Sequence, residues 1–338
     1  LPGVISPNET ATGFTVRGGA MDQNRVIWDG INIYHKGHLF GMLSAFNPNS
    51  TRKVIFHNQG THSRFGERAS SVIDIYSINK ITNRFKVGVG VNGINTDIYI
   101  EAPIVKDKLS IQASLRRSYT ELYQSITFTK IADKVFQDTK ITNAQNINND
   151  FFFIDYNIKL NYQLNDANRF YASTIYIDND LNYLVKYSDL NSSYNDVLDI
   201  KNDGYSFGWD KIWNPTLVQH TKVFLSRYSL AYNYMTSANG GQISNFEKKN
   251  EIYDSGVSTE LILTAKKNNK LTLGYQYVLK DVSYLFKENV GSPLILDTDK
   301  TIIKTHSIYA QYNYNNSKLF FINMGIRSSY YQELDAVR

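Results

Sequence analysis

The fold of this chain is decided by a short stretch near its middle, Ile154-Asp-Tyr-Asn-Ile-Lys-Leu-Asn-Tyr162. Every second residue in it is apolar or aromatic, and the residues between them are charged or carry an amide. Successive side chains of a β-strand point to opposite faces of the sheet. The stretch therefore predicts a strand with one apolar face and one polar face.

The same period of two returns along most of the chain after residue 84. We predict eleven strands, at residues 84–92, 95–104, 108–118, 151–163, 168–178, 204–213, 217–235, 252–265, 270–286, 304–315 and 319–331. Short turns alternate with long connections, which are expected at about 119–150, 179–203, 236–251 and 287–303. No helix of consequence is expected between the strands.

This pattern favours an all-β fold, a transmembrane antiparallel β-barrel with lipid on its outside. Many of the strands reach the roughly 9–11 residues that cross a bilayer at a tilt. Aromatic residues such as Trp209, Trp213 and Tyr232 cluster near strand ends, as in the girdles at membrane interfaces. Short turns that alternate with long loops are typical of outer-membrane barrels, and a closed barrel leaves no unpaired strand edge in lipid.

Composition excludes several other classes. The 338 residues contain no cysteine, which excludes disulfides, thiolate nucleophiles and cysteine-based metal sites. The formal net charge of +5 is small for this length, and without a block of like charges it does not indicate nucleic-acid binding. No run approaches the roughly 18 apolar residues of a membrane-spanning helix. Because the chain begins at Leu1 without a signal segment, we expect it to be part of a longer protein.

The first eighty residues follow a different pattern. Short β-prone runs are interrupted by Gly18-Gly19 and by Asp29-Gly30. An Asp-Gly pair between two such runs predicts a tight hairpin turn with positive φ. The segment is too small and too rich in glycine to build a large core, so enclosure by another structure would stabilise it.

The motifs of this segment occur in a recognisable order: Phe14-Thr-Val-Arg-Gly-Gly19, Trp28-Asp-Gly30, His38-Leu-Phe-Gly41, Phe46-Asn-Pro48 and Ser70-Ser-Val-Ile-Asp-Ile75. Together they resemble the plug domain of TonB-dependent outer-membrane receptors. They are most similar to the Bacteroidetes-type branch that carries a carboxypeptidase-regulatory-like domain, and they do not resemble the starch-system branch. The run Phe65-Gly-Glu-Arg68 departs from the family's frequent Tyr-Gly-Gly-Arg.

The resemblance implies two domains. Residues 1–80 would be the plug, with its front part missing, and residues 81–338 would be the first half of the transmembrane barrel. Plugged transporters have about 22 strands, so the eleven predicted here leave half of the barrel outside this sequence. The resemblance also implies the outer membrane of a Gram-negative cell. The implied partners are outer-membrane lipid and TonB of the inner-membrane energy complex, reached through a segment upstream of this chain; a surface lipoprotein or other outer-membrane subunits are further candidates.

The residues that carry the resemblance are the candidate plug-motif and anchoring residues. They are Arg17, Gly18, Gly19, Asp29, Gly30, His38, Phe40, Gly41, Asn47, Gly66, Arg68, Ser70, Ser71 and Asp74. We expect Arg17 and Arg68 to anchor the plug to the lumen wall by pairing with carboxylates such as Asp29, Glu67 or Asp74. Contact with the substrate is the alternative role for both arginines.

No catalytic, metal or cofactor site is expected. The pair His35-x-x-His38 has a spacing that suits a metal, but two histidines on a loop without cysteine or a clear carboxylate are weak evidence for one. A packing role for His38 is favoured. No nucleophile elbow, phosphate-binding loop or zinc-protease helix occurs, so the protein is not expected to be an enzyme.

The function implied by the resemblance is uptake of a scarce ligand, such as a siderophore, metal complex, vitamin or oligomer, by displacement of the plug. The alternative is a plugged barrel that serves as a non-transporting structural or regulatory subunit of a larger secretion or lipoprotein complex. The ligand-binding residues are not identified. Tyr183, Tyr187 and Tyr194 either stack on sugars or catecholate rings or belong to an ordinary surface loop.

Overall fold

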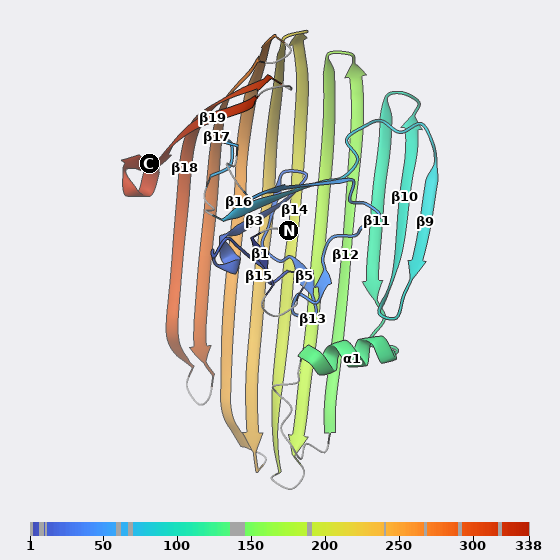
Figure 1. Cartoon of the computed structure of the whole chain (residues 1–338). Helices are drawn as coiled ribbons and strands as arrows, with labels where there is room; N and C mark the ends of the chain where they lie inside the picture. The colour runs from blue at the N-terminus through green and yellow to red at the C-terminus, as the bar shows by residue number, and fades with distance from the viewer. Residues whose placement is uncertain are drawn as a thin grey trace.

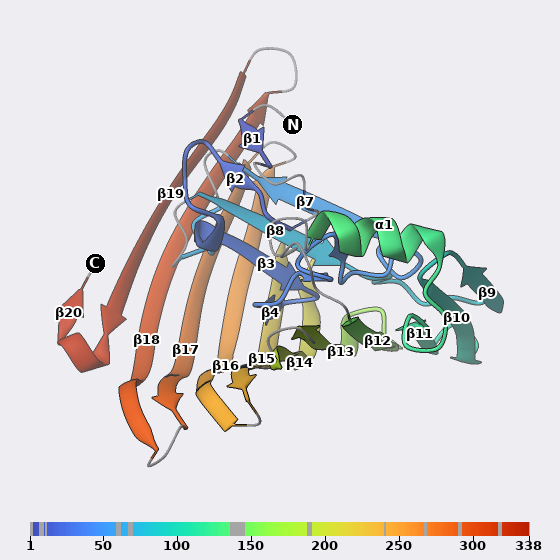
Figure 2. The same ribbon diagram turned by 90° about the horizontal axis from the view of Figure 1, so that it is seen from below.

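One large curved antiparallel sheet dominates the computed structural model, and the N-terminal segment lies against its hollow face (Figures 1 and 2). The structure describes residues 3–6, 10, 12–58, 62–66, 70–135, 146–187, 191–239, 241–266, 269–289, 293–316 and 320–337. None of the helices within these ranges is long and apolar enough to span a membrane.

The sheet, called the wall below, consists of strands in sequence order, each paired with the next. The strands are β9 (Lys86–Val91), β10 (Asn95–Val105), β11 (Leu109–Ser118), β12 (Asn146–Asn165), β13 (Asn168–Tyr187), β14 (Ser192–Asn214), β15 (Leu217–Ala238), β16 (Gly241–Lys266), β17 (Asn269–Glu288), β18 (Leu294–Asn316), β19 (Phe320–Tyr331) and β20 (Ala336–Val337). All eleven predicted strands are present, and the two-residue β20 is a twelfth. Strands β9 and β20 form the two edges, so the described wall is open.

The prediction of long loops is wrong for three of the four connections. Residues 179–203, 236–251 and 287–303 lie mostly in strands, which extend β13 to β18 to between 20 and 26 residues. The apolar alternation ends there because the outward face becomes charged: Leu225 is followed on that face by Arg227, which pairs with Asp203 at 2.8 Å. Backbone pairing needs no apolar face and continues to Ser192 opposite Ala238.

The expectation of no helix is also wrong. Helix α1 (Ile126–Val135) lies in the connection between β11 and β12, on the hollow side of the wall (Figure 2). Its Phe128 and Ala132 pack against Phe151 and Phe153 of β12 and against Leu39 of the N-terminal segment. Ser125 caps the helix, because its Oγ accepts a hydrogen bond from the backbone N–H of Phe128 at 3.1 Å.

The two faces of the wall have opposite polarity. Outward side chains are apolar and exposed, for example Ile158 at 38%, Phe207 at 51% and Ile308 at 63%. Inward side chains are polar and buried, and among them Lys159 and Asn202 are at most 2% exposed. A water-soluble sheet would bury its apolar face. The wall therefore has the polarity predicted for a barrel with lipid outside and a polar lumen.

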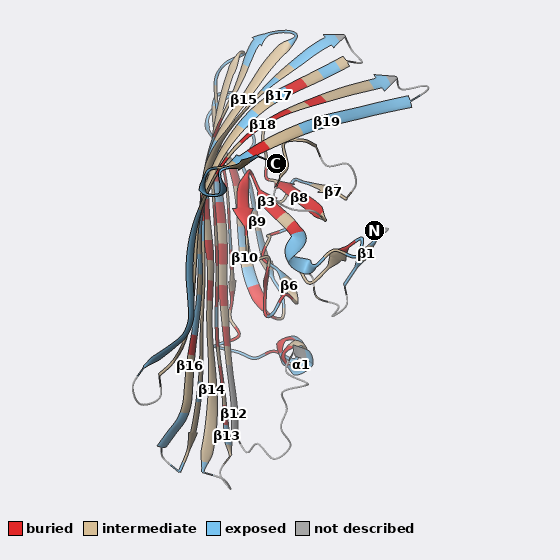
Figure 3. Cartoon of the chain, turned by 90° about the vertical axis from the view of Figure 1, so that its left-hand side faces the viewer, coloured by how far each residue is buried: buried red, intermediate tan, exposed pale blue. Residues whose placement is uncertain are grey.

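The N-terminal segment, called the plug below, lies on the polar face of the wall (Figure 3). Its four-stranded sheet has the order β4 (Ile31–Ile33), β3 (Asn24–Trp28), β8 (Ser71–Tyr76) and β7 (Lys53–His57). Two small hairpins, β1 (Val4–Ile5) with β2 (Thr15–Val16) and β5 (Gly37–His38) with β6 (Leu43–Ser44), and the turn helix η1 (Met21–Gln23) complete it.

We predict that Ile158→Arg destabilises the folded barrel in a bilayer by about 2–4 kcal/mol, because it places a charge within the apolar outward belt. The matched control is Asp180→Arg, on the same face but beyond the belt, which should change stability little. Urea unfolding in lipid vesicles, followed by the heat-modifiable mobility of the barrel, measures both. Equal effects of the two variants would contradict a lipid-facing belt.

Candidate functional site

The contact surface between plug and wall is the best-defined site of the described structure. Part of it is apolar: plug residues Val26, Trp28 and Ile31 share one core with Ile175 and Ile177 of β13. Trp28 is fully buried and stacks on Phe46 of the plug at a ring distance of 5.8 Å. The rest of the surface is polar, and its contacts decide how the plug is held.

Asp29 is the most connected polar residue of this surface. It begins the predicted Asp-Gly turn, with φ of 46° at Asp29 and 91° at Gly30, between paired strands β3 and β4. One carboxylate oxygen accepts from the Lys159 ammonium of β12 at 2.9 Å, and the other accepts from the Ser173 hydroxyl of β13 at 3.1 Å. The Asp29 carbonyl accepts from Ser206 of β14 at 3.0 Å. One plug residue thus joins three wall strands.

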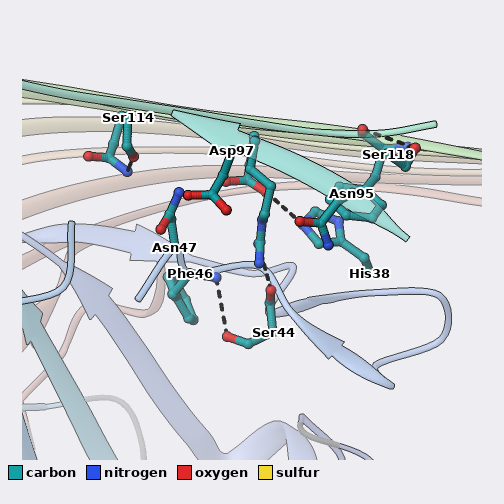
Figure 4. A network of polar contacts seen from close by, with 12 residues as sticks. His38, Ser44, Phe46, Asn47, Asn95, Asp97, Ser114 and Ser118 are labelled. Atoms are coloured by element: carbon teal, nitrogen blue, oxygen red, sulfur yellow. Dashed lines mark hydrogen bonds and ion pairs between the residues drawn. The ribbon is translucent and has the colours of Figure 1, made fainter. Parts of the chain in front are cut away.

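His38 anchors the plug loop that follows β4. It is fully buried, with Nδ1 2.7 Å from Asn179 Oδ1 and Nε2 3.1 Å from Asp155 Oδ2. Its ring stacks on Phe153 at 4.0 Å. Asp155 also accepts from Arg116 at 2.7 Å (Figure 4 shows the surrounding network). Packing is the role that the sequence favours for His38. In the structure its ring packs on Phe153, and its two ring nitrogens also lie beside polar atoms of the wall.

Strand β4 is held by side chains from β14 and β16. The Asn32 amide donates to Asp254 at 2.7 Å, and the Tyr34 hydroxyl donates to the same carboxylate oxygen at 2.5 Å. The Tyr34 backbone N–H donates to Asn202 Oδ1 at 2.7 Å. Ser226 of β15 completes the set, because its hydroxyl donates to the Asn32 carbonyl at 2.6 Å.

An arginine outside the predicted set bridges the far side of the plug to the wall. Arg64 lies 3.3 Å from Asp74 of the plug and 3.8 Å from Glu260 of β16. The Arg327 guanidinium of β19 donates to the carbonyls of Ser63 and Arg64 at 3.4 and 3.1 Å. The plug also reaches β10, where Asp97 accepts from Asn49 at 2.8 Å, so its polar contacts run along the wall from β10 to β19.

Arg17, one of the two predicted arginine anchors, is not placed as expected. Arg17 is exposed, and within the described residues it forms no ion pair. The carboxylates proposed as its partners are engaged elsewhere, Asp29 by Lys159 and Asp74 by Arg64. The backbone turns at Arg17, with φ of 52°, and at Gly18. This turn keeps the Arg17 side chain at the surface. Arg68 and Glu67 lie outside the described residues.

The other motif residues shape the plug. Gly18 and Gly41 have positive φ, of 75° and 86°. Asn47 is buried and caps a turn by accepting from the backbone N–H of Asn49 at 2.9 Å. Both serines of the Ser70-Ser71 pair donate hydrogen bonds within the plug, Ser70 to Gln23 and Ser71 to Asn24. A side chain at Gly19 would overlap Ser70, a side chain at Gly66 would meet Arg327, and Phe40 is exposed.

Sequence reasoning missed the wall partners Lys159, Asn202 and Asp254. Lys159 is on the polar face of a predicted strand and Asp254 is within another, whereas Asn202 falls in the expected loop 179–203. The alternation gave no sign of which plug atom each would meet. The described residues include no group of three or more His, Asp or Glu side chains positioned to hold a metal ion.

No protein-family model and no curated protein matches this sequence. Solved structures match it well. The outer membrane transporter YddB of Escherichia coli has a TM-score of 0.65 and 13% identity, over 100% of this chain and 54% of that one. A variant of the ferric enterobactin receptor PfeA of Pseudomonas aeruginosa has a TM-score of 0.64 and 10% identity, over 98% and 54%. The ferric yersiniabactin uptake receptor FyuA of Yersinia pestis has a TM-score of 0.55 and 9% identity, over 98% and 65%.

The chain has the fold of these plugged barrels. At such low identity the likeness establishes architecture alone. The chain spans about half the length of YddB and of PfeA.

We predict that Asp29→Asn lowers the free energy of unfolding of the plug by about 3–5 kcal/mol, because it leaves the buried Lys159 ammonium without its counter-charge. The double variant Asp29→Asn with Lys159→Met should lose less free energy of unfolding than the sum of the losses in the two single variants. Denaturation followed by the fluorescence of Trp28, in a Trp209→Phe and Trp213→Phe background, measures the plug. Additive losses would show that the pair is not coupled.

We also predict that the plug loses stability in acid through His35. Burial, with a smaller contribution from nearby His38, lowers the pKa of His35 to about 3. Because the unfolded chain binds the proton near pH 6.5 and the folded plug does not, the stabilisation is complete above pH 6.5 and is lost as the pH falls toward 3. The loss at pH 5 is about 2 kcal/mol.

The measurement compares the wild type with His35→Gln by the same fluorescence assay between pH 7 and pH 5. The variant should have a shallower decline. His57 and His62, whose pKa values are also lowered by burial, contribute equally to both proteins, so only the difference between the two curves reports His35. Parallel curves would exclude His35 as a source of the acid sensitivity.

Proposed function

We propose that this chain is the later part of the plug and the first half of the barrel of a TonB-dependent outer-membrane receptor. In this proposal the protein lies in the outer membrane of a Gram-negative cell and imports a scarce ligand by displacement of the plug. The observation that carries the proposal is the plug on the polar, buried face of a wall whose outer face is apolar. The order of plug motifs supports the Bacteroidetes-type branch.

The nature of the plug–wall contacts supports displacement. Most of the contacts described above are hydrogen bonds, with a few ion pairs such as Asp29 with Lys159. A hydrogen bond within the protein is worth only about 0.5–1.5 kcal/mol net, because water replaces it when the groups separate. A plug held by many such bonds is stable at rest, yet each polar contact can be replaced by water when the plug moves into a wet lumen.

The ligand would approach from the end of the wall at which strands β13 to β18 continue beyond the apolar belt. At that end Tyr34 and Lys36 of the plug, with Tyr228 and Lys280 of the wall, line a cavity of about 190 Å³. Ligand contact there fits a siderophore, a metal complex, a vitamin or an oligomer. Tyr183 and Tyr194, predicted in a loop, lie instead on strands beside α1, and Tyr183 is buried in its core.

TonB, which would supply the energy through a segment upstream of this chain, and outer-membrane lipid are the partners of the proposal. Cells deleted for the gene, and cells deleted for TonB, should both fail to accumulate the ligand. Unchanged uptake in both would contradict transport. A stoichiometric complex purified from native membranes, formed without TonB, would instead support the non-transporting subunit in a secretion or lipoprotein assembly.

We predict that tethering the plug to the wall abolishes uptake. Asn157 of β12 donates to the Ser50 hydroxyl of the plug at 2.9 Å, so a Ser50→Cys and Asn157→Cys pair joined by a short thiol crosslinker would fix the two together. Because the sequence has no cysteine, the background reaction in this region is zero. Uptake should fall at least tenfold and return when a reducible linker is cleaved.

The matched control is a tether within the plug. Ser71 donates to Asn24 at 2.6 Å, so Ser71→Cys with Asn24→Cys joins two plug strands without linking plug to wall. This control should retain uptake if the plug moves as one body. Full uptake through the plug–wall tether would contradict displacement of the plug at this contact.

A further inference from the structure

A small cavity lies between the plug sheet and strands β15 to β19 of the wall. Its volume is about 90 Å³. Four cationic side chains line it, two from the plug and two from the wall: Arg25, Arg64, Lys222 and Arg327. Two carboxylates, Asp74 and Glu260, also line it, so the cationic groups outnumber the anionic groups by two.

Both carboxylates already have several partners. Arg64 lies 3.3 Å from Asp74 and 3.8 Å from Glu260, so a single arginine is shared between them. The Tyr76 hydroxyl donates to Asp74, and the Tyr309 hydroxyl donates to Glu260 at 2.7 Å. Arg64 and the two carboxylates together carry a net charge of −1, so the three other cations of the cavity still exceed the negative charge by two.

Lys222 and Arg25 are the cations that this arrangement leaves out. Within the described ranges, no hydrogen bond or ion pair reaches the Lys222 ammonium. Its side chain lies over Gly30, where any larger residue would overlap it. Arg25 donates to the Asn32 side chain at 2.8 Å and to the Gly66 carbonyl at 3.5 Å, and both acceptors are neutral.

Excess positive charge between two packed surfaces is unfavourable, because the like charges repel one another and each of the four cations is partly buried. The cations also come from opposite sides of the contact, so the repulsion would push the plug away from the wall. A volume of about 90 Å³ holds roughly three water molecules, or one small ion with one or two waters. A bound anion would satisfy Lys222 and remove the repulsion.

We propose that this cavity binds a small monovalent anion of halide size, which bridges Lys222 of the wall to Arg25 of the plug. Arg25 also lines the cavity beside Tyr34, but Lys222 lines only the proposed anion site. The proposal does not depend on whether the protein transports anything. The site makes the seating of the plug dependent on the anion. The anion acts as a removable bridge between the two parts of the protein.

The direct test is a crystal of the full-length protein soaked in bromide. Anomalous scattering should show a bromide in the cavity, in contact with the Lys222 ammonium, and no bromide there in Lys222→Met. Absence of the peak in the wild-type protein would overturn the proposal.

The second test is thermal unfolding at equal ionic strength in chloride and in gluconate, which is too large for the cavity. Chloride should raise the Tm of the wild type by about 2 °C or more relative to gluconate. Lys222→Arg should keep the rise and Lys222→Met should lose it. Lys86→Met, which removes an exposed lysine paired with Glu101, is the matched control and should keep it.

An equal chloride effect in Lys222→Met and in the wild type would overturn the proposal, since the effect would then come from the surface. If Lys222→Met fails to fold in either salt, the bromide peak in the wild-type protein and the chloride response of Lys222→Arg decide the question without it. The presence of both supports the site, and the absence of either contradicts it.

Discussion

The structure depends on one constraint: the polar face of the wall is buried, and buried polar groups must be paired. A polar group left without a partner costs about 1–3 kcal/mol, more when it is charged. Lys159, Asn202 and Asp254 are among the least exposed residues of the chain, and each finds its partner on the plug. The plug is thus required by the wall as much as it is enclosed by it.

The same constraint explains why the plug is built around turns rather than a large core. Its functional atoms are at the ends of short strands, where the Asp29-Gly30 turn and the loop carrying His38 reach the wall. Positive φ at Asp29, Gly30, Leu39 and Phe40 bends the chain so that a carboxylate and an imidazole project from the plug. Regular strands would present backbone groups to each other and not to the wall.

Helix α1 adds an apolar contact to this polar surface. Phe128 packs between the inward aromatic residues of β12 and Leu39 of the plug, directly after the buried His38. The connection between β11 and β12 therefore folds back into the hollow of the wall and covers the plug loop on one side. Leu181 and Tyr183 of β13 belong to the same core, so the wall holds the helix as well as the plug does.

The sequence by itself determined the architecture, because strand periodicity is a local property. The alternation of Ile154, Tyr156 and Ile158 with Asp155 and Asn157 predicts a strand with one apolar and one polar face. Strand length, aromatic residues near strand ends and the alternation of short and long connections then favour lipid on the apolar side. The ordered motifs from Phe14 to Ile75 were sufficient to indicate a plug. Where the outward face became charged, as at Asp203 and Arg227, the periodicity faded and the strand ends were predicted too early.

Only the tertiary structure decided which polar residues meet. The arginine that bridges plug and wall is Arg64, not Arg17, and Asp29 is paired with Lys159, 130 residues further along the chain. A spacing in the sequence carries no information about such partners, because the curvature and register of the wall set which side chain faces which turn. The excess of positive charge around Lys222 is likewise visible only when five strands of the wall and two of the plug line one cavity.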